Sequence, residues 1–287
     1  HNWIRESFRV NKGMDTFVKE IITAKGSLYM NGPANYYQIN SNPTALTEAT
    51  SQLFMGIRLE CAKCHHHPFE SFSQADYYGM TAFFSRVGTK NSEEFGLFGR
   101  ERAGIVQPSG EARHPRTGKN MVPTVLHGEA MEHPLDRRIP LAKWLASPDN
   151  PWFAKSIVNR YMSYLLGRGL VEPVDDLRST NPATNEEMFI ELATYLEEHQ
   201  YDVKQLVKVI MNSRLYQLSS QPTELNKSAG KFYAFYKVKR LAAEPLLDAI
   251  NTATATTTKF TNLPLGTLAT ELPDTNYNNY FLKTFGK

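Results

Sequence analysis

Cysteine is scarce in this sequence. Only two of the 287 residues are cysteine, which excludes a scaffold held together by many disulfide bonds. The two lie at Cys61 and Cys64, and a histidine, His65, follows directly. The thiol chemistry of the chain is therefore concentrated in one short CxxCH motif.

Long apolar runs and an excess of charge of one sign are also missing. No uncharged apolar stretch reaches about 18 residues, so we expect no membrane-spanning helix. Lys and Arg number 32 and Asp and Glu 29, and the only compact basic run is at 237–240. We expect that run to be a solvated helix face, and we expect no nucleic acid as a partner. The sequence contains neither an internal repeat nor a Gly-rich phosphate loop.

A CxxCH motif is typical of the covalent attachment of a c-type haem. Thioether bonds join the two cysteines to the vinyl groups of the haem, and the histidine binds its iron. We therefore expect one haem c per chain, bound by Cys61 and Cys64, with His65 as an iron ligand. Aromatic side chains near the motif, including Phe69 and Tyr78, could cover the apolar faces of the haem, although they also fit an ordinary helical core.

Two other kinds of site use similar residues, and both remain as less favoured alternatives to haem. A CxxC pair can be a redox disulfide, but that use expects a βαβ context, which does not precede Cys61. Zinc or non-haem iron could be bound by Cys61, Cys64, His65 and His67. A structural zinc site, however, usually takes its ligands from two separated segments of chain.

The second axial ligand of the iron is not part of the motif. We favour His114, because Pro115 and Gly118 could hold it in a rigid turn. His67 follows His65 too closely to reach the opposite face of the haem, so we expect it beside the ligand or at the surface. The remaining candidates are His127, His133, Met55, Met80 and Met121.

Asp175 and Asp176 form an adjacent acidic pair. Adjacent carboxylates point in different directions in an extended chain and are poorly placed to act together on one bond. We therefore expect ion pairs with Arg160, Arg168 or Arg178 rather than acid–base catalysis.

The apolar pattern predicts a mainly α fold. Helical periodicity places helices at about residues 14–24, 43–59, 74–86, 138–147, 152–166, 185–199, 203–216 and 231–251. Residues 31–42 and the chain from 262 onward are expected to be loop. Residues 88–134 are irregular and rich in Gly and Pro, with room for short strands such as 104–107.

Two parts of the sequence resemble one known family. Residues 54–70, which contain the motif, and residues 74–79 resemble the planctomycete-type secreted cytochrome family. The second half is similar to the helical partner domain of that family, so the resemblance covers nearly the whole chain. The sequence departs from the family in having His66 where an acidic residue is usual and Glu70 where Asp is usual.

The resemblance implies a division into domains. It implies a haem-bearing cytochrome-like domain at residues 1–87 and a helical companion domain at 135–287, joined by the irregular segment 88–134. It also implies further chain before residue 1 and after residue 287. Covalent attachment of haem takes place outside the bacterial cytoplasmic membrane, so we expect a periplasmic or extracellular protein.

Electron transfer with a redox partner protein is the function we expect. One alternative is a haem enzyme that oxidises peroxide or another substrate at an open iron site beneath residues 88–134. Another is a structural or interaction protein in which the haem only stabilises the fold. The sequence leaves open which of these applies, whether the protein is an enzyme, and its oligomeric state.

Overall fold

The structure is a computed structural model and describes residues 1–91, 101–274 and 276–286. The chain divides into two compact units, Asn2–Lys237 and Val238–Lys287. Helices make up 43% of the structure, and a single small sheet accompanies them, so the expected mainly α fold is confirmed.

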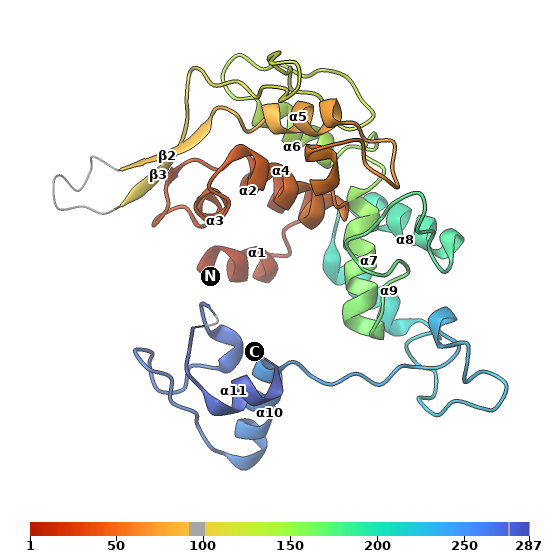
Figure 1. The fold of residues 1–287 in the computed structure, drawn as a ribbon. Coiled ribbons are helices and arrows are strands. Elements are labelled where there is room, and N and C mark those ends of the chain that lie inside the picture. The colour runs from red at the N-terminus through yellow and green to blue at the C-terminus, as the bar shows by residue number, and fades with distance from the viewer. Residues whose placement is uncertain (92–100, 275, 287) are drawn as a thin grey trace. The chain divides into compact units, whose positions relative to one another are not determined.

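The larger unit, Asn2–Lys237, contains helices α1 to α9 and all three strands of the sheet (Figure 1). Its α-helices are α1 (Asn2–Arg9), α2 (Met14–Ile22), α3 (Tyr36–Ile39), α4 (Pro43–Thr50), α5 (Gln74–Ala82), α6 (Arg138–Leu145), α7 (Phe153–Leu166), α8 (Glu186–Glu198) and α9 (Val203–Asn212). Its strands are β1 (Gly26–Ser27), β2 (Val87–Asn91) and β3 (Arg102–Val106). The smaller unit contains α10 (Ala243–Thr254) and α11 (Tyr280–Phe285).

The sheet is antiparallel, with the strand order β1-β3-β2. Val87 of β2 lies opposite Val106 of β3, and Gly26 of β1 lies opposite Gly104. The short strand expected near residues 104–107 is therefore present as β3. Part of the irregular segment, residues 92–100, lies outside the described residues.

Helix starts agree with the capping signals in the sequence. The side chain of Asn42 accepts a hydrogen bond from the backbone of Ala45 and opens α4. Ser73 and Asp76 form a reciprocal capping box at the start of α5. At the C-terminal end of α7, Gly167 adopts the left-handed conformation that stops a helix, with φ 78°.

One predicted helix ends earlier than expected, and this changes the setting of the motif. After α4 the chain makes a single π-helical turn at Ser51–Met55 and stops at Gly56, whose φ is 66°. The prediction of a helix running to Leu59, with the CxxCH motif at its end, is therefore wrong. The motif begins in a separate 3-10 turn, Glu60–Lys63.

Three further differences concern short helices. The expected loop 31–42 contains α3, and the helix expected from residue 231 begins only at Ala243. The expected C-terminal loop contains α11, which Asn279 caps. Leu282 of α11 is fully buried in a separate small core with Leu247 and Phe260, so packing within the smaller unit accounts for this helix.

The larger unit has a single hydrophobic core that draws on nearly its whole length. It includes Val18 from α2, Phe84 after α5, Leu141 from α6, Val158 from α7 and Leu206 from α9. Both boundaries expected from the sequence, near residues 87 and 134, fall inside this unit.

A buried arginine crosses this core at the start of α6. The side chain of Arg138 is 1% exposed and makes a paired contact with Asp136, with Nε 3.0 Å from Oδ1 and Nη2 2.8 Å from Oδ2. Its Nη1 donates to the carbonyl of Ala24 at 2.8 Å, and its guanidinium lies over the ring of Tyr37. A buried charge is tolerated when it is paired and hydrogen-bonded in this way.

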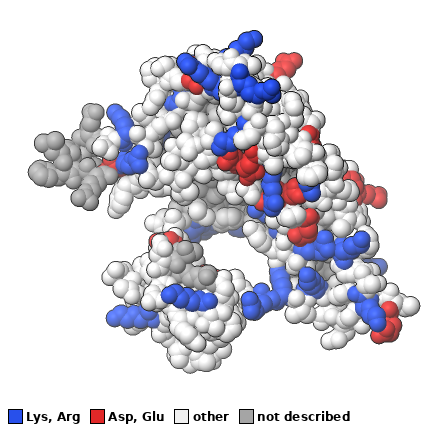
Figure 2. Space-filling view, in the orientation of Figure 1, with Lys and Arg blue, Asp and Glu red and all other residues white. Residues whose placement is uncertain are grey.

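The surface carries both signs of charge. In Figure 2, basic and acidic side chains are interspersed over the visible face of the Asn2–Lys237 unit. None of the helices in the described part of the chain has the length and apolar character needed to cross a membrane.

Candidate functional site

The two thiols lie on the outside of one tight turn. In a 3-10 helix, side chains three residues apart lie on the same side, which places Cys61 and Cys64 together. Both thiols are free and exposed. Between them Ala62 is fully buried, as is Leu59 just before the turn. The inner side of the turn is therefore anchored in the core, and its outer side presents both sulfur atoms.

Helix α5 and a shared carboxylate hold this turn in place. The buried side chain of Gln74 donates to the carbonyl of Lys63 at 2.7 Å. Glu48 of α4 accepts from Lys63 Nζ at 3.1 Å and from the Tyr77 hydroxyl at 2.6 Å. Burial raises the pKa of Tyr77, so its phenol keeps the proton that it donates.

His65 carries its proton on the nitrogen that a metal-binding histidine commonly protonates. Its Nδ1 lies 2.6 Å from the backbone carbonyl oxygen of His66. Because a carbonyl can only accept, Nδ1 must donate, and the neutral ring then has a free lone pair on Nε2. Metal-ligating histidines are usually oriented by a hydrogen bond of this kind.

His67 is arranged differently. Its Nε2 lies 3.1 Å from the carbonyl of Arg58, and its Nδ1 accepts from the backbone N–H of Phe69 at 3.2 Å. Both ring nitrogens are therefore used by the backbone, and His67 supports the loop that follows the motif.

A cavity of about 450 Å³ lies beside the motif, and it brings His65 and His114 together. Its size falls within the range of small-molecule and cofactor sites. The lining residues are His65, His66, Ser73, Gln74, Ala75, His114, Arg116 and Thr117. Of these, the sequence predicted only His65 and His114 as site residues, although Ser73 and Asp76 at a helix start and the turn at 113–118 were available signals for the others.

His114 stands in a tight turn that closes on itself. Its backbone N–H donates to Lys119, and Gly118 donates back to the carbonyl of His114. The Tyr78 ring lies 6.1 Å from the His114 ring, between centroids. Nδ1 of His114 accepts from the backbone N–H of Arg116 at 3.3 Å, which places the proton of the neutral ring on Nε2.

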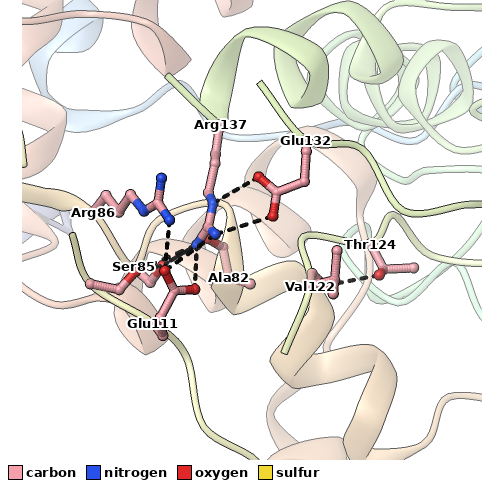
Figure 3. A network of polar contacts seen from close by, with 9 residues as sticks. Ala82, Ser85, Arg86, Glu111, Val122, Thr124, Glu132 and Arg137 are labelled. Atoms are coloured by element: carbon pink, nitrogen blue, oxygen red, sulfur yellow. Dashed lines mark hydrogen bonds and ion pairs between the residues drawn. The ribbon is translucent and has the colours of Figure 1, made fainter. Parts of the chain in front are cut away.

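A network around Arg137 fixes the segment that carries His114 (Figure 3). The Arg137 side chain is 5% exposed and forms ion pairs with Glu111 at 2.9 Å and Glu132 at 3.1 Å. Arg86 also pairs with Glu111, at 2.7 Å, and Ser85 accepts from Arg137. Because Glu111 precedes His114 by three residues, this network helps to position the wall of the cavity that faces the start of α5.

The other histidines considered as ligands lie elsewhere. His127 bonds to Ser71 through Nε2 at 2.8 Å and packs between Phe72 and Trp152. His133 accepts two backbone N–H groups through Nδ1, from residues 135 and 136. Neither of these histidines lines the cavity beside the motif.

Most of the aromatic side chains near the motif belong to the protein core. Phe72, Tyr77, Phe83 and Phe84 are buried there, and so are the candidate ligands Met55 and Met80. Met121 is half-buried, and it does not line the cavity. Phe69 is 54% exposed and stacks on Arg178, 4.7 Å away.

The donors around the cavity fit a covalently attached haem, but few apolar side chains are present to cover the haem faces. Two adjacent free thiols, the free Nε2 of His65 and the nearby cation of Arg116 suit vinyl groups, iron and propionates respectively. The lining is mostly polar, with Ala75 as its apolar member. Among the residues that the structure describes, no three His, Cys, Asp or Glu side chains gather as a metal site.

The acidic pair forms ion pairs, as expected, but with one different partner. Asp176 lies 3.4 Å from Nε of Arg178, and Asp175 pairs with Arg58 at 2.7 Å. The Arg58 guanidinium and the Gln52 amide hold the pKa of Asp175 below its usual value, against the effect of burial. Asp175 thereby ties the residues before the motif to the second half of the chain.

Comparison with known proteins gives two separate matches, one in each half of the chain. Residues 1–89 match a family model described as PSCyt2, a protein of unknown function (DUF1549). Residues 137–276 match a model described as PSD1, a protein of unknown function (DUF1553). Together the matches fit the planctomycete-type family of domains of unknown function. No curated protein and no solved structure matches the chain.

The Arg137 network should make stability depend on pH through Glu111. Hydrogen bonds from Arg86 and Arg137 hold the pKa of Glu111 below its usual 4.5, so its contribution is present above pH 4.5 and lost as the pH falls through the lowered value. We expect Glu111→Gln to lower the melting temperature at pH 7 by about 1–4 °C. The difference from wild type should shrink below pH 4.5.

Tryptophan fluorescence during thermal melting, repeated from pH 3 to pH 8, measures this difference. Glu129→Gln is the matched control, because Glu129 is an exposed glutamate of the same segment for which no ion pair is found among the described residues. A Glu111→Gln difference that stays constant with pH would contradict the assigned role.

Proposed function

We propose that the protein carries one haem c, bound through Cys61 and Cys64, and that His65 is an iron ligand. The observation that supports this most strongly is the hydrogen bond from His65 Nδ1 to a backbone carbonyl, directly after two free exposed thiols. Nε2 of His65 makes no hydrogen bond with any residue that the structure describes, so its lone pair is free for a metal.

Each residue has a distinct part in this proposal. The two thiols add across the vinyl groups, so that each sulfur–hydrogen bond is replaced by a sulfur–carbon bond and the hydrogen passes to the neighbouring vinyl carbon. His65 holds the iron from one side, and Arg116 offers a cation for a propionate. When bound, the haem supplies a metal that takes up and releases one electron.

Electron transfer is the role that the open cavity favours. The thiols are exposed and the lining is polar, so an edge of the haem would face solvent, where a redox partner protein can approach. Because haem is attached covalently outside the bacterial cytoplasmic membrane, the proposal includes a periplasmic or extracellular location.

The attachment can be tested on protein made by its native host. We expect a haem absorption spectrum and, under denaturing conditions, a chain mass increased by one haem. Cys64→Ala removes one thioether, so much less pigment should survive denaturation than in wild type. A colourless native protein, or unchanged covalent retention in Cys64→Ala, would refute the proposal.

The role of His65 can be separated from general effects of losing a histidine. His199 is a suitable control, because it is exposed and its Nδ1 also lies near a backbone carbonyl, that of Tyr195 at 2.8 Å. We expect His65→Gln to keep the thioethers but to change the spin state and the absorption bands of the haem. His199→Gln should have the spectrum of wild type, and identical spectra for both variants would exclude His65 as the ligand.

A haem enzyme is a second candidate, favoured by the hydrogen bonding of His114. Since Nδ1 of His114 accepts from Arg116, its Nε2–H is a donor rather than a lone pair for iron. As an iron ligand, His114 would give a low-spin spectrum that His114→Ala abolishes. As a donor beside an open site, it would leave five-coordinate iron in wild type, which absorption and resonance Raman spectra identify.

A further inference from the structure

A second cavity, of about 360 Å³, lies in the larger unit and shares no lining residue with the cavity beside the motif. Helices α7 and α8 both begin at it, since Trp152 is the residue that precedes α7 and Glu186 is the first residue of α8. The positive ends of two helix dipoles therefore face this cavity.

Two cationic side chains also line the second cavity, and both have an acidic neighbour. Lys155 pairs with Glu186 at 2.8 Å. Arg178 lies 3.4 Å from Asp176, and its Nε is buried without a hydrogen-bond partner in the described structure. Its terminal nitrogens likewise make no hydrogen bond with any described residue. The paired donors of a guanidinium match the two oxygens of a carboxylate.

The acidic side chains at this cavity are already occupied. Glu70 accepts from the backbone N–H of Ser179 at 2.5 Å and from its hydroxyl at 3.2 Å. Glu186 is bound to Lys155. The guanidinium of Arg178, beside Asp176, keeps hydrogen-bond donors unused, and these donors suit an anionic ligand.

The rest of the lining is largely apolar. Trp152, Val171, Leu177 and Phe189 contribute to it. The Trp152 ring is braced by Phe72, with 6.1 Å between ring centroids. A rigid aromatic face next to an anion-binding group is suited to a molecule that has both an apolar body and a charged head.

We propose that this second cavity binds a compact organic carboxylate. The carboxylate pairs with the guanidinium of Arg178, and the apolar body lies between Trp152 and Phe189. The volume of the cavity accommodates a small molecule rather than a polymer, and the site operates independently of the CxxCH motif.

Calorimetric titration of the purified full chain at pH 7 tests this site. The probe is 3-phenylpropionate, and 3-phenylpropanamide is its neutral counterpart of nearly the same shape. We expect the acid to bind with saturation and the amide to bind at least about tenfold more weakly, because it cannot form the charged pair with Arg178. Equal binding of acid and amide, or no binding of either, overturns the proposal.

Variants then locate the binding. Arg178→Gln should weaken the acid about tenfold or more and leave the amide unchanged. Arg214→Gln is the matched control, because Arg214 is exposed and does not line the cavity, and it should bind like wild type. Arg178→Lys keeps the charge without the paired donors and should weaken binding of the acid severalfold. This variant serves as the test if Arg178→Gln is unfolded at the temperature of the titration.

Two results would place the ligand in a different class. If inorganic sulfate displaces the acid at equal concentration, the site recognises a bare anion and the organic body contributes nothing. If Arg178→Gln and Arg178→Lys both retain wild-type affinity for the acid, binding occurs elsewhere on the chain. Either result overturns the proposal, whatever the outcome of the haem experiments.

Discussion

Two consecutive buried arginines at the start of α6 connect the parts of the larger unit. Arg138 binds Asp136 and the carbonyl of Ala24, which lies just after α2. Arg137 points to the other side and binds Glu111 and Glu132 of the irregular segment. Leaving a charge buried without its partners is costly, so the residues around this pair are held in one arrangement.

That constraint explains how a segment with little regular structure can form a wall of a cavity. The turn with His114 belongs to no described helix or strand, and it is held by its own backbone bonds, by the nearby Tyr78 ring and by Glu111. The opposite wall, with His65, rests on the buried Ala62 and on Gln74. The cavity is therefore defined by contacts between segments that are distant in sequence.

Local signals in the sequence predicted much of the helical structure. The Ser73 and Asp76 capping box and the stop at Gly167 both depend on neighbouring residues, and both are found in the structure. The single π-helical turn before Gly56 left no recognisable pattern. The six-residue helix α11 is too short for periodicity to indicate and forms because Leu282 fills a small core.

The candidate site was only partly predictable, because its residues come from segments that are distant in sequence. Spacing alone identifies Cys61, Cys64 and His65, because the motif is contiguous. Local signals indicate a helix start at Gln74 and a turn at Arg116, but only long-range packing brings these two residues to one cavity with His65 and His114. Phe69 was predicted to cover the haem but does not line this cavity. It packs instead against Arg178, which is more than a hundred residues away in sequence.

The two cavities differ in the chemistry of their linings. One has polar walls, free thiols close by and three histidines, which suits a covalently held group. The other combines an aromatic wall with an arginine that has unused donors, which suits a ligand that comes and goes. Asp175 pairs with Arg58, which precedes the motif, and the neighbouring Asp176 pairs with Arg178 at the second cavity.

The 3-10 turn fixes the side from which a group could be attached to the two thiols. Ala62 closes the interior on one side of the turn, and the sulfur atoms stand on the other. A haem joined to these thiols, as proposed above, would therefore be attached at the surface of the turn and not within the core.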